Sequence, residues 1–158
     1  MHHNRLYLSL AIVAAMVHLP AQTACEFDHA VFRDAANRGF TLEFSPVSSE
    51  DASVVALAQL RHKTRGVIFQ FELEHASGFG RFYLTRTDSP DPRSYDVYYF
   101  DSRMFETSGN TAAWVFVDGL GPADWYDTRN DPQLGNTMWK FQRCKRPQAP
   151  TIRGKIPP

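Results

Sequence analysis

The sequence has few cysteines, no net charge and no hydrophobic run long enough to cross a membrane. Two cysteines among 158 residues allow one intramolecular disulfide at most. Lysine and arginine balance aspartate and glutamate at 17 each, and this argues against a nucleic-acid partner, since general nucleic-acid binders are markedly basic. The longest apolar run, of roughly 14 residues, falls short of the ~20 that a spanning helix needs, so we expect no membrane span.

Recognisable catalytic and metal-binding patterns are also missing. His29, His62 and His75 lie far apart, and none belongs to a ligand pattern such as His-Glu-x-x-His. Ser77 in Ala-Ser-Gly-Phe-Gly superficially resembles the nucleophile turn of hydrolases, but no histidine follows it. We therefore expect no metal, no cofactor and no catalytic residue of these kinds, and the sequence does not identify an enzymatic activity.

The first 24 residues have the build of a secretory signal peptide. Arg5 precedes the apolar run Leu6–Leu19, and a small, polar segment closes it at residues 20–24. This pattern predicts a cleaved leader over residues 1–24 and a mature protein in the periplasm or outside the cell. The remaining chain of about 134 residues matches the commonest size of a single domain.

The two cysteines stand at the two limits of the predicted domain. Cys25 opens the mature chain and Cys144 ends its last structured segment, so in an oxidising compartment we expect a Cys25–Cys144 disulfide. The alternative is lipidation of Cys25 as in bacterial lipoproteins, but Gln22 departs from the leucine that their signal prefers. We prefer the disulfide because a second cysteine is present.

The domain over residues 25–144 is predicted to be mainly β, an antiparallel β-sandwich or small β-barrel with one short helix at most. Apolar and polar residues alternate with period two, and turn residues separate the runs. Residues 27–37 suggest a short helix or an irregular entry, and residues 53–62 favour a strand over a helix. The expected strands are Phe40–Phe44, Val67–Glu74, Arg81–Thr87, Tyr95–Asp101, Ala113–Asp118 and Thr137–Cys144.

The most distinctive segment is a predicted loop at residues 119–131 that is dense in aromatic and hydrogen-bonding side chains. Such side chains can stack on a sugar ring and bond its hydroxyls, or anchor a protein partner. The alternative is that the aromatic pair folds back to cover one end of the core. The predicted ligand-binding residues are Trp125, Tyr126, Asp124, Asp127, Arg129 and Asn130.

These observations favour an exported, non-catalytic binding or interaction module whose ligand is an unknown carbohydrate or a protein of the envelope or extracellular space. A different class is a small exported hydrolase of cell-wall or extracellular polymer, since a glycosidase needs only two carboxylates across a cleft. Its candidates are Glu72, Glu74, Asp101 and Asp118. A purely structural envelope protein is a third alternative. The basic, proline-rich residues 145–158 are predicted to be a disordered tail.

Overall fold

The computed structural model describes residues 25–48, 52–76, 80–129 and 131–145. The predicted signal peptide lies outside these residues, and of the predicted tail only Lys145 is included. The elements are η1 (Phe27–His29), β1 (Ala30–Asp34), β2 (Phe40–Ser45), β3 (Val54–His62), β4 (Gly66–His75), β5 (Phe82–Arg86), β6 (Ser94–Phe100), η2 (Gly109–Thr111), β7 (Trp114–Val117), α1 (Leu120–Thr128) and β8 (Met138–Cys144).

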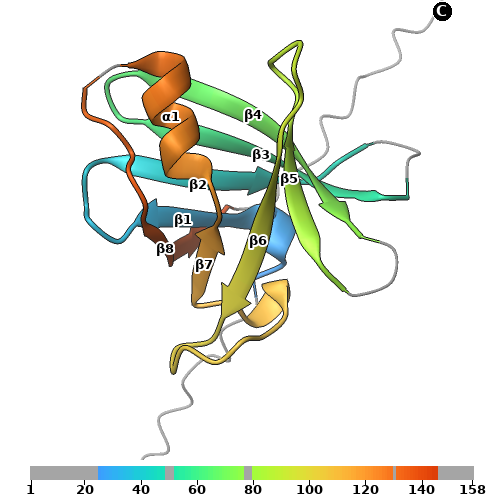
Figure 1. The fold of residues 1–158 in the computed structure, drawn as a ribbon. Coiled ribbons are helices and arrows are strands. Elements are labelled where there is room, and N and C mark those ends of the chain that lie inside the picture. The colour runs from blue at the N-terminus through green and yellow to red at the C-terminus, as the bar shows by residue number, and fades with distance from the viewer. Residues whose placement is uncertain (1–24, 49–51, 77–79, 130, 146–158) are drawn as a thin grey trace, which may run out of the picture.

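The eight strands form a closed antiparallel barrel (Figure 1). Each strand pairs with its neighbour in sequence, and β8 returns to pair with β1. The prediction of a mainly β domain is confirmed. Of the two architectures that the sequence allowed, a sandwich or a small barrel, the structure is the barrel. Closure leaves no unpaired sheet edge, which is the usual weak point of an antiparallel sheet.

The strand predictions are confirmed from β2 onward, including the ambiguous residues 53–62, which form β3. The alternation within the predicted strand Val67–Glu74 would place Val67 on the inward face with Phe69 and Phe71. Val67 is instead 40% exposed, so that prediction is wrong at the start of the strand. The pairing of β3 with β4 shifts there: Leu60 lies opposite Phe69, whereas Arg61 lies opposite Val67, so one residue of β4 has no partner. A bulge of this kind reverses the alternation of side chains.

The N-terminal segment contains a short helix, as expected for residues 27–37, but Ala30–Asp34 form a strand that the sequence did not predict. A single 3-10 turn, η1, is followed directly by β1, which pairs with both β2 and β8. Three consecutive residues at the start of β1, Ala30, Val31 and Phe32, are buried. A strand buried on both faces has no period-two pattern, which explains why the sequence did not reveal it.

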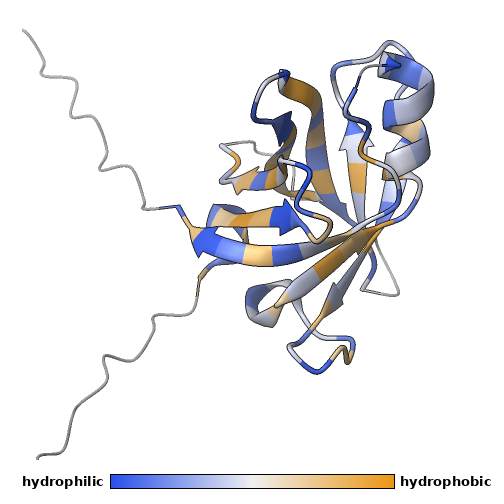
Figure 2. Cartoon of the chain, turned by 90° about the vertical axis from the view of Figure 1, so that its left-hand side faces the viewer, coloured by the Kyte–Doolittle hydropathy of each residue, from blue (hydrophilic) through white to orange (hydrophobic). Residues whose placement is uncertain are grey.

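The hydrophobic core fills the barrel interior. Figure 2 shows strands banded with alternating hydrophilic and hydrophobic residues. Successive side chains of a strand point to opposite faces, so the hydrophobic set is directed into the barrel. An eight-stranded barrel is just wide enough for its interior to be filled by side chains or to hold one small ligand. Most of the fully buried side chains are aromatic or leucine, and the largest are Trp139, Phe32, Phe40, Phe44, Phe69 and Phe71.

The predicted disulfide is present and lies at the seam where the barrel closes. Cys25 and Cys144 are bonded, with their Cα atoms 5.6 Å apart. Cys144 also lies opposite Ala30 in the ladder between β8 and β1, so the bond reinforces the pairing of the first and last strands. A disulfide is typical of an oxidising, exported location. Among the described residues, no helix is long and apolar enough to cross a membrane.

Replacing both Cys25 and Cys144 by alanine is expected to lower the free energy of unfolding by about 4 kcal/mol, because the bond closes a loop with a sequence separation of 119. The barrel should still form, since its ladder does not depend on sulfur. Urea unfolding followed by circular dichroism measures both effects. An unchanged midpoint would contradict a stabilising role for the bond.

Candidate functional site

The segment that was predicted to be a binding loop is largely helical, and this corrects the sequence prediction. Gly119 adopts the left-handed conformation (φ 75°) immediately before α1, which few residues other than glycine tolerate. Pro122 lies in the first helical turn, where its missing N–H would have had no intrahelical partner. The helix covers one end of the barrel, which we call the helix end (Figure 1).

Asp124, a predicted ligand-binding residue, is completely buried beneath this helix. Arg65, in the turn between β3 and β4, donates to both of its carboxylate oxygens at 2.8 and 3.3 Å. The Thr128 hydroxyl and the Leu134 backbone N–H each donate to it at 2.8 Å. Asp124 therefore anchors the helix and the segment after it to the barrel, and its carboxylate does not reach the protein surface.

The same contacts determine the protonation of Asp124. Burial alone would raise the pKa of this carboxyl group, but the donors from Arg65, Leu134 and Thr128 outweigh it and lower the pKa below the ordinary value of 3.8. Asp124 is thus a carboxylate at neutral pH and holds its ion pair with Arg65.

A second ion pair fastens the outer side of α1. Arg86 of β5 pairs with Asp127 of the helix and also with Asp88, 2.6 Å away, and its guanidinium lies 4.1 Å from the centre of the Phe69 ring. Asp127 therefore already has a partner. Arg129 follows the helix in the left-handed conformation and is exposed, whereas Asn130 lies outside the described residues.

Trp125 and Tyr126 point away from the core, with 55% and 69% of their surfaces exposed. The alternative that they fold back to cover the core is therefore wrong. Trp125 borders a shallow cleft of about 190 Å³ that Gln133 and Asn136 also line. Among the predicted residues that the structure describes, Trp125, Tyr126, Asp127 and Arg129 are exposed, and of these Asp127 is paired with Arg86.

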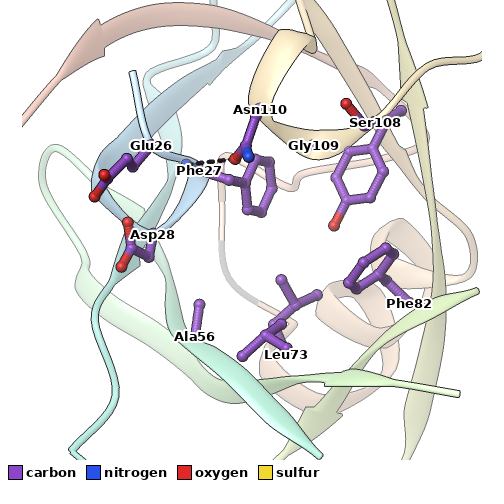
Figure 3. A pocket seen from close by; sticks show the side chains of 11 residues that line it. Glu26, Phe27, Asp28, Ala56, Leu73, Phe82, Ser108, Gly109 and Asn110 are labelled. Carbon is purple, nitrogen blue, oxygen red and sulfur yellow. Dashed lines mark hydrogen bonds between the residues drawn. The ribbon is translucent and has the colours of Figure 1, made fainter. Parts of the chain in front are cut away.

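A larger pocket, of about 470 Å³, opens at the opposite end of the barrel, which we call the mouth (Figure 3). Sequence reasoning did not predict it. Its lining comes from η1, from strand ends and from the connection that contains η2. The residues are Glu26, Phe27, Asp28, Val55, Ala56, Leu73, Phe82, Tyr99, Ser108, Gly109 and Asn110.

Phe27 inserts into the mouth and forms one wall of this pocket. Its ring lies 4.3 Å from that of Phe44 in the core and 4.9 Å from that of Tyr99, centre to centre. The Asn110 side-chain oxygen accepts a 3.3 Å hydrogen bond from the Phe27 backbone N–H (Figure 3). Gly109 packs on the ring, where an added Cβ would come within 3.2 Å. The contacts hold η1 and η2 together across the mouth.

Tyr99 and Phe82 form the opposite wall. Their rings meet edge to face, with centres 5.4 Å apart. Tyr99 is only 5% exposed, and burial raises the pKa of its hydroxyl, which therefore stays neutral throughout the physiological range. No described residue forms a hydrogen bond with that hydroxyl, although Tyr99 lines the pocket.

The rim of the mouth carries negative charge. Glu26 and Asp28 lie side by side there (Figure 3), and His29 Nδ1 is 2.7 Å from one carboxylate oxygen of Asp28. One carboxylate oxygen each from Glu26 and Asp28 and one ring nitrogen of His29, all atoms of the kind that can bind a metal ion, lie within 4.8 Å of one another. Glu26 is exposed, and its nearer oxygen is 4.0 Å from the His29 nitrogen.

The remaining candidates do not meet in one cleft. Glu72 and Glu74 lie on the outer face of β4, where the Thr85 hydroxyl donates to Glu74 at 3.0 Å. Asp101 and Asp118 follow two adjacent antiparallel strands, so they lie at opposite ends of the barrel. The Asp101 side chain accepts bonds from the backbone of Arg103 and Phe105, and these donors lower its pKa. The four carboxylates therefore do not form a glycosidase pair.

The other two histidines have structural surroundings. Buried His62 donates from Nε2 to the Arg38 carbonyl oxygen at 3.1 Å and accepts from the Thr64 hydroxyl at 3.1 Å. Exposed His75 meets the ring of Phe82 edge to face at 5.0 Å. Neither histidine contacts a carboxylate among the described residues.

The sequence of β3 contains a signal for the pocket at the mouth. The inward positions of β3 include Ala56 and Ala58, whereas the neighbouring strands place phenylalanine or leucine inside. A short side chain leaves space in a barrel whose other strands carry large ones, and Ala56 borders the pocket. The pattern becomes informative only when the barrel is known.

No protein-family model, curated protein or solved structure matches this chain. Its function must therefore be inferred from the two ends of the barrel. The helix end is sealed by a buried ion pair and has an exposed aromatic surface. The mouth has a preformed pocket with an aromatic wall and an acidic rim.

Replacing Asp124 by asparagine should lower the free energy of unfolding by about 3 kcal/mol at pH 7, because it leaves the Arg65 charge buried without its partner. The pKa of Asp124 is lower in the folded state than its ordinary value of 3.8. The ion pair therefore contributes its full stabilisation above pH 3.8, and this contribution is lost as the pH falls through the folded-state pKa. The difference between the two proteins should shrink below about pH 4. Denaturant unfolding across pH 2.5–7 tests this, and a constant difference would contradict it.

Proposed function

We propose that this protein is an exported, non-catalytic binding module that takes an apolar ligand into the mouth of its barrel. The pocket at the mouth is the observation that carries the proposal. Its volume of about 470 Å³ lies within the range of small-molecule sites, and barrel mouths are a recurrent place for them. The disulfide and the predicted signal peptide support a location in the periplasm or outside the cell.

The chemistry of the lining supports binding more than catalysis. Leu73, Phe82 and Tyr99 provide the apolar surface of the pocket, and its polar side chains come from Glu26, Asp28, Ser108 and Asn110. His29, which contacts the rim carboxylate of Asp28, does not line the pocket. An apolar ligand would gain from leaving water without requiring the protein to reorganise.

The neutral aromatic dye N-phenyl-1-naphthylamine should bind to the mouth and fluoresce more strongly when it enters the apolar pocket. Replacing Ser108 by tryptophan should weaken this binding by about tenfold or more, because a large ring at this exposed rim position obstructs the pocket. Fluorescence titration measures the affinity.

Ser102→Trp is the matched control, since Ser102 is also exposed in the connection between β6 and β7 but does not line the pocket. It should bind the dye like the unchanged protein. Equal loss in both variants, or no loss in Ser108→Trp, would contradict a binding site at the mouth.

The exposed surface of α1 is a second candidate for binding, directed at carbohydrate. Trp125 and Tyr126 are exposed without a packing role, and the cleft beside Trp125 includes the side chains of Gln133 and Asn136. Aromatic rings next to amide groups suit the stacking and hydrogen bonding of a sugar. An envelope or extracellular protein is the other partner class for this surface.

Alanine at both Trp125 and Tyr126 should abolish retention on immobilised cell-wall polysaccharide while changing the unfolding midpoint little, since both side chains are exposed. Co-sedimentation measures retention, and thermal unfolding checks the fold. Phe105→Ala, at another exposed aromatic residue, is the control. Unchanged retention in the double variant would remove this surface as the site.

A further inference from the structure

We infer that the ligand of the mouth is a cation, namely an alkylated or quaternary ammonium group attached to an apolar body. This inference rests on the proposed function and specifies the ligand class of the same pocket. It depends on three features of the lining: the sign of its charge, the arrangement of its aromatic rings and its unpaired polar atoms.

The charge of the pocket is negative. Glu26 and Asp28 are its charged residues, and among the described residues that line it there is no lysine, arginine or histidine. Of the basic groups at this end of the barrel, His75 and Arg81 line a neighbouring cleft beyond Phe82 and Tyr99, whereas two others have acidic partners. His29 contacts Asp28 at 2.7 Å, and Lys145 lies 3.2 Å from Glu43. A cation entering the pocket thus finds the carboxylates of the rim, whereas an anion is repelled.

The aromatic rings provide the second part of a cation site. Tyr99 is edge to face with Phe27, at an interplanar angle of 79°, and with Phe82, at 73°. These edge-to-face contacts join the three rings into one aromatic wall, and the half-buried ring of Phe82 is its most accessible part. A ring face attracts a quaternary ammonium ion, as in the aromatic cages that bind such ions. Figure 3 shows Phe27 and Phe82 directed into the pocket from different sides, with Leu73 below them.

The Tyr99 hydroxyl is a polar group of the pocket that is compatible with an ammonium ligand. Tyr99 is nineteen-twentieths buried, and its hydroxyl oxygen, which no described residue engages, has lone pairs for a ligand N–H or a bound water. The raised pKa of Tyr99 keeps this group uncharged, so the negative charge stays at the rim. The ammonium group would lie between the rim carboxylates and the ring of Phe82, with its apolar body against Leu73 and the aromatic wall.

Three probes of nearly the same shape test the inference: benzyltrimethylammonium, its neutral isostere neopentylbenzene, and the anion phenylmethanesulfonate. Chemical-shift titration of the disulfide-bonded protein, followed at the backbone amides of Gly109 and Asn110, measures each affinity. The cation should bind about tenfold more tightly than the neutral probe, and the anion most weakly.

The double variant Glu26→Gln, Asp28→Asn removes the rim charge and should reduce cation binding to the level of the neutral probe without changing neutral binding. Asp91→Asn removes an exposed carboxylate at the helix end and is the control. Thermal unfolding checks that both variants fold.

Equal binding of cation and neutral probe, or a cation affinity that the double variant does not change, would overturn the cation inference and leave the proposed function in place. If none of the probes, whatever its charge, shifted the mouth amides and the dye also failed to bind, the proposed function would be overturned as well. Preference for the cation that disappears in the double variant supports both.

Discussion

The pairing of the first strand with the last is the constraint on which the rest of this structure depends. In an up-and-down barrel all other strand pairs join neighbours in sequence, whereas β1 and β8 must meet from opposite ends of the domain. The disulfide holds this seam at the mouth, and a hydrogen bond from the Ala35 N–H to the Met138 carbonyl oxygen continues the pairing toward the helix end, at 2.8 Å. With the seam closed, η1 is brought over the mouth and Phe27 reaches the interior.

The two ends of the barrel are closed by different physical means. At the helix end a buried ion pair, Arg65 with Asp124, fixes α1, and Gly121 permits the helix to pack directly against the backbone of Gly135. A buried ion pair needs strict geometry, because each charge has lost its water. At the mouth, Phe27 enters from a single 3-10 turn, and its ring contacts and the hydrogen bond to Asn110 leave room beside it. The end with the ion pair carries exposed aromatic residues, and the mouth carries the pocket.

The sequence was informative where one residue's environment follows from its neighbours. Alternation in Phe40–Phe44 was sufficient to predict β2, and the two cysteines were sufficient to predict their bond. It failed where tertiary contacts decide: β1 is buried without alternation, and Gly-Leu-Gly-Pro, typical of a turn, begins a helix. Whether an aspartate is a surface ligand or a buried anchor depends on an arginine 59 positions away. The mouth joins segments that only barrel closure brings together.

The location of the disulfide also decides how the protein can be attached to anything else. Cys25 and Lys145 both lie at the mouth, and the Lys145 backbone N–H donates to the His29 carbonyl oxygen there at 2.7 Å. Chain that continues beyond either residue must therefore leave beside the pocket. A surface support joined directly to Lys145 would hold the mouth toward the support, whereas one joined through the exposed face of α1 would leave the mouth facing solution. Orientation on a biosensor is thus set by the choice of attachment point.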